Sequence, residues 1–329
     1  MRILSSAASI AALADPIRRF LPEAQFEFLT PADIADRGGD FEVALLSRDI
    51  AGTSASDVLS ESLVEFYAAM RASQTLRWVQ LYSAGADRAV YRELYHQGVT
   101  ITTAAGTTAT EVAHSAIAGM LALARRFPLL MQAQRDRRWA SLHREGLPQG
   151  LAGSHALVVG FGPIGKAICG LLEAFGVKVS CARRTVGAPD GADFEFLTYD
   201  GINAVVPRMD WIFIACPLTP LTRKLVGKQV LGNMKPSAAI INVARGGVID
   251  QDALIERLLE GRLGGAFLDV FEVEPLPADS PLWSMPNVMV TPHSASHTLE
   301  NAGRVRELFV QNLGRFMLSL PMENEIRLS

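Results

Sequence analysis

The feature that most constrains the fold is a glycine-rich stretch near the middle of the chain. An apolar run at 156–159 predicts a buried strand, and Gly160, Gly162 and Gly165 follow it at the spacing G-x-G-x-x-G. Residues 164–175 then carry apolar side chains at helical spacing. Glycine turns are common, but between a strand and a helix these glycines permit a tight turn, a close approach of a pyrophosphate and close helix packing. The helix N-terminus also offers unpaired N–H groups to phosphates, so the stretch predicts a dinucleotide-binding fold.

The end of the next predicted strand bears on which dinucleotide is bound. The strand at 177–182 is followed by Arg183 and Arg184, where an acidic residue would hold the ribose 2′-hydroxyl. Two guanidiniums can instead grip a 2′-phosphate or stack on the adenine. The alternative is an ordinary solvated arginine pair at a strand end. We therefore expect NADP(H) to be preferred, with NAD(H) as the second cofactor.

Length and composition limit the class of protein. The chain has 329 residues, which suits two domains, and 49% hydrophobic against 20% charged residues can fill large cores. A net charge of −3 gives no footprint for nucleic acid or an anionic membrane, and no uncharged apolar run is long enough to span a bilayer. Three cysteines, Cys169, Cys181 and Cys216, are too few and too scattered for a disulfide framework or a zinc site. We therefore expect no metal and, without a signal-peptide pattern, a cytoplasmic protein.

Short apolar strands alternate with helices along the chain, which predicts two doubly wound parallel-sheet α/β domains. Strands are predicted at 1–4, 26–29, 43–47, 76–81 and 99–102, and in a second set at 156–159, 177–181, 211–215, 239–243, 265–269 and 288–291. Helices are predicted at 7–20, where Pro16 could kink or split the helix, and at 58–71, 87–96, 110–126 and 298–318. Pro128 is interpreted as a helix breaker, and residues 321–329 as a tail.

Three charged residues follow successive strands of the second set, where the carboxyl ends of parallel strands converge on a ligand crevice. They are Arg245, Glu274 and His293. A guanidinium matches a planar carboxylate and an adjacent keto oxygen, and a histidine can protonate that oxygen as hydride reaches the carbon. A carboxylate bonded to the histidine favours the imidazolium and orients the ring. This set is what the reduction of a 2-keto acid needs.

One strand end of the first set could also meet a ligand. The strand at 76–81 leads into Ala84 and Gly85, whose backbone groups could contact a small anionic substrate. An ordinary strand-to-helix turn would explain the same residues equally well.

At these residues the sequence resembles the D-isomer-specific 2-hydroxyacid dehydrogenase family, and the resemblance covers nearly the whole chain. Its most specific runs lie at 234–250, 267–277 and 286–293, and residues 216–222 are similar to the family's P-L-T-x-x-T loop. The resemblance implies a Rossmann cofactor domain, 104–295, inserted into a smaller flavodoxin-like substrate domain, 1–103 plus 296–329.

The resemblance also implies roles for individual residues. Arg245 would bind the substrate, His293 would be the general acid/base and Glu274 its partner, while Ala84 and Gly85 would meet the substrate carboxylate. Asp269 would lie near the nicotinamide amide. The residues expected to bind the cofactor are Gly160, Gly162, Pro163, Ile164, Gly165, Arg183, Arg184, Cys216, Pro217, Thr222, Val243, Ala244 and Asp269.

The paired arginines look like the NADPH-linked glyoxylate/hydroxypyruvate reductase branch of this family. The resemblance implies a reductase of small 2-keto acids, forming D-2-hydroxy acids. Formate dehydrogenases of the family pair the histidine with glutamine, so Glu274 argues against that activity. Two alternatives stay open: a non-catalytic NAD(P)H-binding regulator, against which the intact Arg, Glu and His weigh, and a dehydrogenase of a bulkier 2-hydroxy acid.

The helix at 110–126 bears on assembly. It is apolar nearly all round, which one domain face cannot easily cover, so we expect a homodimer with Trp139 near the partner chain. Trp139 could also be a core residue. His114 stands on this helix where many relatives have glutamate, and we interpret it as a core or interface residue.

Overall fold

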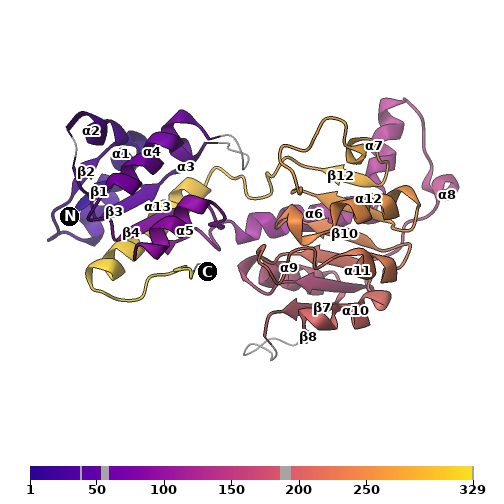
Figure 1. The fold of residues 1–329 in the computed structure, drawn as a ribbon. Helices are drawn as coiled ribbons and strands as arrows, with labels where there is room; N and C mark the ends of the chain where they lie inside the picture. The colour runs from indigo at the N-terminus through magenta and orange to yellow at the C-terminus, as the bar shows by residue number, and fades with distance from the viewer. Residues whose placement is uncertain (38, 53–58, 186–193, 328–329) are drawn as a thin grey trace. The chain divides into compact units, whose positions relative to one another are not determined.

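The computed structural model describes residues 1–37, 39–52, 59–185 and 194–327, which form two compact units (Figure 1). Unit 1 comprises Met1–Thr107 together with Thr298–Ser329, and unit 2 comprises Thr108–His297. The chain therefore begins in unit 1, builds the whole of unit 2 and returns to unit 1 with its last helix.

Unit 1 contains one parallel five-stranded sheet in the order β2-β1-β3-β4-β5. Its strands are β1 (Arg2–Leu4), β2 (Glu27–Leu29), β3 (Val43–Leu46), β4 (Trp78–Leu81) and β5 (Thr100–Thr102). Its helices are α1 (Ala7–Phe20), α2 (Pro31–Arg37), α3 (Arg48–Ala51), α4 (Glu61–Ala72), α5 (Ala89–His96) and α13 (Asn301–Met317). This is the flavodoxin-like strand order, in which the direction of winding reverses between β1 and β3.

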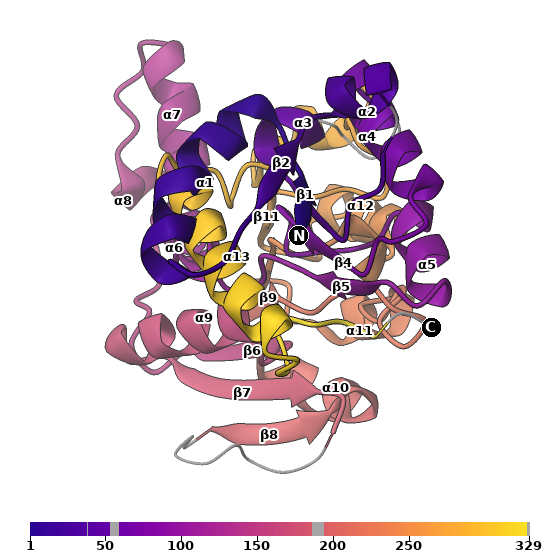
Figure 2. The ribbon, with the colours of Figure 1, turned by 90° about the vertical axis from the view of Figure 1, so that its left-hand side faces the viewer.

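Helices cover both faces of this sheet, and every residue of the central strands β3 and β4 is therefore buried. On one face α1 and α13 pack together (Figure 2), and the Trp78 ring stacks on Phe309 with centroids 5.1 Å apart. The helix α1 runs through Pro16 without a break. The helix predicted at 58–71 begins at Glu61 in the structure, and Val58 lies outside the described residues.

The C-terminal segment is bound to unit 1, so its interpretation as a tail is wrong. The Asn312 amide donates to the Glu323 carbonyl at 3.0 Å and accepts from the Glu323 N–H at 2.7 Å. Beyond that pair, Glu325 forms an antiparallel bridge with Thr102 of β5. Thr102 lies far from the segment in sequence and Asn312 lies on a separate helix, which is why the segment's local composition did not reveal the docking.

Unit 2 contains a parallel seven-stranded sheet in the order β12-β11-β10-β9-β6-β7-β8. Its strands are β6 (His155–Val159), β7 (Lys178–Arg183), β8 (Glu195–Thr198), β9 (Trp211–Ile214), β10 (Ala239–Asn242), β11 (Gly265–Leu268) and β12 (Val288–Val290). Its helices are α6 (Ala109–Ala124), α7 (Phe127–Arg135), α8 (Leu142–Glu145), α9 (Pro163–Ala174), α10 (Ile202–Val205), α11 (Lys228–Asn233) and α12 (Gln251–Leu259). Short 3-10 turns lie at Tyr199–Gly201, Val206–Arg208, Gly246–Val248 and Pro281–Trp283.

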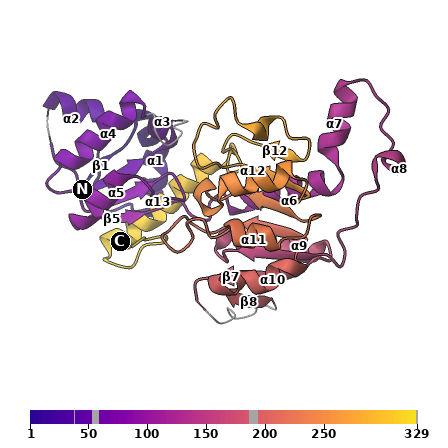
Figure 3. The same ribbon diagram turned by 45° about the vertical axis from the view of Figure 1, so that its right-hand side comes forward.

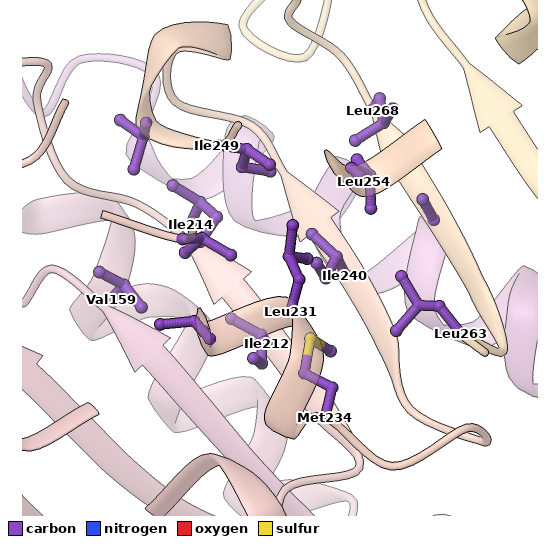
Figure 4. Close-up of a cluster of buried hydrophobic side chains, with 14 of the residues drawn as sticks. Val159, Ile212, Ile214, Leu231, Met234, Ile240, Ile249, Leu254, Leu263 and Leu268 are labelled. Carbon is purple, nitrogen blue, oxygen red and sulfur yellow. The ribbon is translucent and has the colours of Figure 1, made fainter. Parts of the chain in front are cut away.

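This order is that of the doubly wound dinucleotide-binding sheet, and it reverses between β6 and β9. The prediction of two parallel α/β domains is thus confirmed, although the edge strand β8 was missed because it is short and nowhere fully buried. Helices α11 and α12 close a large core on one face of the sheet (Figure 4). Helices α6 and α9 pack on the other face, where they contact each other.

Helix α6 is covered mainly by its own unit. Ile117 and Met120 are buried, whereas His114 is exposed, so a core position for His114 is wrong. Pro128 lies in the first turn of α7 and begins a helix instead of breaking one, since a proline N lacks the N–H that a first turn leaves unpaired. Helices α7 and α8 project from the rest of unit 2 (Figure 3), and Trp139 between them is 96% exposed, which excludes the core alternative.

Within the described ranges, no helix is both long and apolar enough to cross a membrane.

Candidate active site

The turn after β6 has the backbone shape that a dinucleotide needs. Gly160 has a φ of 107°, and a Cβ there would lie 2.7 Å from the backbone of Ala215. A Cβ on Gly165 would collide with the carbonyl oxygen of Gly160. A Cβ on Gly162, in contrast, would meet no atom within 4 Å. The first and third glycines are therefore required by packing, while the second leaves open space in front of the helix.

That space lies at the N-terminus of α9, which no side chain caps. Gly162 is the N-cap, and Pro163 and Ile164 begin the first turn. The first N–H groups of a helix lack intrahelical partners and lie at its positive end. The turn thus fits the pyrophosphate of a dinucleotide, in agreement with the expectation from the glycine spacing.

The paired arginines lie at the carboxyl end of β7. The Arg183 guanidinium donates to the Thr185 hydroxyl at 3.3 Å and lies over the Phe196 ring, 6.0 Å from its centroid. Phe196 in turn packs edge-on against Phe161 of the glycine turn, with centroids 5.0 Å apart. Arg184 is exposed. Arg183 therefore stands beside the turn, and residues 186–193 that follow the two arginines lie outside the described residues.

The loop after β9 is organised by one buried hydroxyl. Thr222 Oγ1 accepts from the Thr219 N–H at 2.8 Å and donates to the Pro217 carbonyl at 2.6 Å. Burial raises the pKa of the Cys216 thiol to about 12. A thiol that is 1% exposed offers nothing to a ligand, so only the backbone of Cys216 could meet the cofactor.

Arg245 is held in an extended conformation directly after β10. The Asn242 side chain bridges the turn: its amide donates to the Arg245 carbonyl at 3.1 Å and its oxygen accepts from the Ala244 N–H at 3.1 Å. Val243 and Ala244 are themselves buried. A Cβ on Gly246 would overlap the Phe271 carbonyl carbon, so only glycine lets this turn lie against the loop that follows β11.

His293 and Glu274 form a bonded pair. The distance between His293 Nδ1 and Glu274 Oε2 is 2.7 Å, and Glu274 Oε1 accepts from the Phe271 N–H at 3.0 Å. Because Nδ1 faces the carboxylate, Nε2 is the ring nitrogen left to face a substrate. The histidine side chain is 48% exposed and the glutamate only 16%.

The charges and hydrogen bonds around Glu274 favour its ionised form. Burial alone would raise the pKa of Glu274, but the hydrogen bonds from His293 and the Phe271 N–H and the positive charges of His293 and Arg245 lower it below its usual value. Arg245 is thus close enough to influence the pair. Glu272, the other candidate partner by sequence, lies instead beside Lys224, with 3.8 Å between Nζ and Oε1.

Asp269 holds the segment that carries His293. Its Oδ1 accepts from the Thr291 hydroxyl at 2.6 Å and the Ser294 N–H at 2.8 Å, and its Oδ2 accepts from the Ala295 N–H at 3.0 Å. Its carbonyl oxygen accepts from the His293 N–H at 2.8 Å, and the backbone of His293 has a φ of 50°. The expected contact with the nicotinamide amide stays a prediction. Sequence reasoning missed this bracing of His293, as it missed Gly246, for which the Gly246-Gly247 pair was the available signal.

Ala84 and Gly85 lie in unit 1, whereas the Arg, Glu and His lie in unit 2. Ala84 is exposed after β4, and the Ser83 hydroxyl donates to the Gly85 carbonyl at 2.6 Å. The Ala104 N–H donates to the Ser83 carbonyl at 2.9 Å, which ties this loop to the end of β5.

A histidine whose Nδ1 is bonded to a carboxylate can give a proton from Nε2, and a nearby arginine can orient a carboxylate. Beside a dinucleotide-type sheet, such an arrangement can supply the proton that accompanies a hydride transfer. The fold and the site together define an NAD(P)-dependent oxidoreductase.

Comparison with known proteins shows to which family the chain belongs. The sequence profile of the D-isomer specific 2-hydroxyacid dehydrogenase NAD binding domain matches residues 117–295. The glyoxylate reductase of Thermofilum pendens is 35% identical over 251 residues, covering 74% of this chain and 73% of that protein. The glyoxylate reductase/hydroxypyruvate reductase of Homo sapiens is 30% identical over 291 residues, covering 86% and 87%.

A solved structure extends the likeness to the whole chain. A D-isomer specific 2-hydroxyacid dehydrogenase from Xanthobacter autotrophicus Py2, in complex with NADPH and MES, has a TM-score of 0.76 and 28% identity, covering 99% of this chain and 97% of that chain. The chain belongs to the D-isomer specific 2-hydroxyacid dehydrogenase family.

Proposed function

We propose that the chain reduces small 2-keto acids such as glyoxylate and hydroxypyruvate to D-2-hydroxy acids, with NADPH in preference to NADH. The observation that carries the proposal is the 2.7 Å bond between His293 Nδ1 and Glu274. The bound dinucleotide would supply the hydride. His293 Nε2 would hold the proton for the keto oxygen, and Glu274 would keep the imidazole ring charged. Arg245 would bind the substrate carboxylate and the adjacent keto oxygen.

We assign cofactor binding to one unit and substrate binding to the other. Unit 2 would be the dinucleotide-binding domain, with the glycine turn, Thr222, Val243, Ala244 and Asp269 as its cofactor contacts. Unit 1 would be the substrate domain, with the backbone of Ala84 and Gly85 at the substrate carboxylate. Human and archaeal relatives named glyoxylate reductases support the substrate class.

The preference for NADPH rests on Arg183 and Arg184, which stand at the strand end where a 2′-phosphate would lie. A structural relative was solved with NADPH, which supports the same cofactor here. The three cysteines form no disulfide framework, and we keep the cytoplasm as the expected compartment.

We also propose a homodimer. The projecting segment with α7 and α8 exposes four large apolar side chains, Phe127, Met131, Trp139 and Leu147, at 49%, 47%, 96% and 66%. Exposed apolar surface of this kind marks an interaction site, and a second copy of the chain would cover it. Light scattering at micromolar concentration should give twice the chain mass, and a monomer would contradict the proposal.

The activity is tested by following oxidation of NADPH and of NADH with glyoxylate, hydroxypyruvate and phenylpyruvate. We expect turnover with the two small acids and a lower Michaelis constant for NADPH. Dinucleotide binding without oxidation by any 2-keto acid would favour the non-catalytic regulator. Faster reduction of phenylpyruvate would favour the bulkier substrate class.

A further inference from the structure

The carboxyl edge of the unit 1 sheet carries side chains that the proposed reaction does not use. In this strand order a ligand is expected where the winding reverses, between β1 and β3. Ser6 follows β1 and Ser47 follows β3; both are buried, with 3.2 Å between their hydroxyl oxygens. The next residue, Arg48, is partly exposed at this edge.

Arg48 is directed toward the loop that follows the neighbouring strand β4. Its Nη1 donates to the Tyr82 hydroxyl at 3.2 Å, and its guanidinium carbon lies 5.8 Å from the centre of the Tyr82 ring. Tyr82 precedes Ala84 and Gly85 by two and three positions. The guanidinium therefore lies beside the loop to which the proposed function assigns the substrate carboxylate.

A second donor fixes the role of the Tyr82 hydroxyl. The Asn301 side-chain amide donates to the same oxygen at 2.9 Å, and the Thr107 hydroxyl donates to the Asn301 carbonyl oxygen at 2.9 Å. Asn301 is 5% exposed. With two donors directed at it, the phenol oxygen is an acceptor in both bonds, and its own proton is left to be donated elsewhere.

Arg48 and Tyr82 thus present only donors to a ligand at this edge, because a guanidinium has no acceptor. Donors, one of them charged, match a carboxylate or a hydroxyl oxygen. We propose that Arg48 and Tyr82 form a subsite for a second acceptor group of the substrate, a carboxylate or hydroxyl on the carbon next to the keto group. Asn301 is a positioning residue for Tyr82. The inference rests on the proposed function, because it places the substrate carboxylate at Ala84 and Gly85.

The test compares substrates that differ only in the acceptor group: hydroxypyruvate with pyruvate, and 2-oxosuccinate with 2-oxobutanoate. The wild-type chain should show the higher kcat/KM for the first member of at least one pair, and the quantity compared is the ratio of kcat/KM between the two members of that pair. Arg48→Met should lower that ratio by about tenfold or more, as expected for the loss of a charge-assisted hydrogen bond. Arg48→Lys, which keeps the charge, should recover part of it. The two pairs separate a carboxylate subsite from a hydroxyl subsite.

Two further variants keep the test decisive. Tyr82→Phe keeps the ring but loses the donated proton, and should lower the same ratio even if Arg48→Met does not fold. Arg71→Met is the matched control, because Arg71 pairs with Glu93 at 2.7 Å on the surface of the same unit, and its ratio should equal that of the wild type. Ratios unchanged in the Arg48 and Tyr82 variants would overturn the subsite. A wild type that reduces no 2-keto acid would overturn the proposed function as well.

Discussion

The carboxyl edges of the two sheets hold their side chains in different ways. In unit 2 the loops are bonded to one another: Asp269 braces the segment of His293, and His293 is bonded to Glu274. In unit 1 Ala84 is exposed, and its loop is held at Ser83, whose carbonyl accepts from the Ala104 N–H, and at Tyr82, whose hydroxyl accepts from Arg48 and Asn301. Proton transfer needs groups held at defined distances before the substrate arrives, whereas recognition can use donors on an exposed loop. Under the proposed function, the bonded, rigid edge of unit 2 would be the site of chemistry and the open edge of unit 1 that of recognition.

The sharpest way to break this comparison is to remove the proton donor of the rigid edge. His293→Ala should lower kcat by about 10²–10⁴, the usual contribution of a positioned acid. Dinucleotide affinity, measured by fluorescence titration, should stay within a few-fold because the glycine turn is untouched. His96→Ala, an exposed histidine of unit 1, is the control. A kcat that survives in the His293 variant would move the chemistry elsewhere.

The cofactor end of unit 2 should give the next largest effect. Replacing Arg183 and Arg184 by glutamine should raise the Michaelis constant for NADPH about tenfold or more for each lost contact, and that for NADH far less. Arg208→Gln is the matched control, because Arg208 pairs with Glu195 at the amino end of β8, away from the strand end that carries Arg183 and Arg184. A wild type that prefers NADH would show that the arginine pair is only solvated.

The third variant tests the pairing within the rigid edge. The pKa of Glu274 is lowered, so the carboxylate stays charged through the neutral range and loses its charge only as pH falls through that lowered value. Glu274→Gln keeps a hydrogen-bonding group but removes the charge that favours the protonated ring. Reduction needs the protonated ring. As pH rises, the reduction rate of the Glu274→Gln variant should therefore begin to fall at a lower pH than that of the wild type.

The pH profile of the reduction rate measures this shift. Oxidation, which needs the unprotonated ring, should suffer less. Glu272→Gln is the control, since Glu272 lies beside Lys224, and it should leave the profile in place. An alkaline limb that does not move in Glu274→Gln would rule out the assigned pair.

The smallest effect on activity is expected at the amino edge of the unit 2 sheet, where the strands begin. Burial alone would raise the pKa of Asp210, but bonds from Lys235 at 2.7 Å and the His155 N–H at 2.9 Å lower it. A lowered pKa in the folded state gives stability that is present at neutral pH and lost as pH falls through it. Asp210→Asn should cost about 1–2 kcal/mol at pH 7 with kcat kept.

Urea unfolding at pH 7 and at acid pH checks this, and the loss should shrink at acid pH. A kcat that falls along with stability would mean that the amino edge also controls the site, and the contrast between edges would have to be redrawn.

Much of the fold could be predicted because its signals are local. Alternating apolar runs and helical spacing predicted the strands of both sheets except β8, and the glycine spacing predicted the turn before α9. The positions of Arg245, Glu274 and His293 after successive strands predicted that they lie at one edge of the sheet, and Glu274 and His293 are indeed bonded there. These inferences need only the residue and its neighbours in sequence.

Tertiary structure alone decided what depends on distant partners. Residues 323–326 dock because Asn312 and the edge of β5 offer groups that match the segment's backbone. Gly246 is required because the Phe271 backbone lies against it, and Asp269 braces His293 through bonds to three residues that follow β12. A hydrogen bond or a close contact between loops is a property of two segments, and neither segment's sequence specifies the other's position.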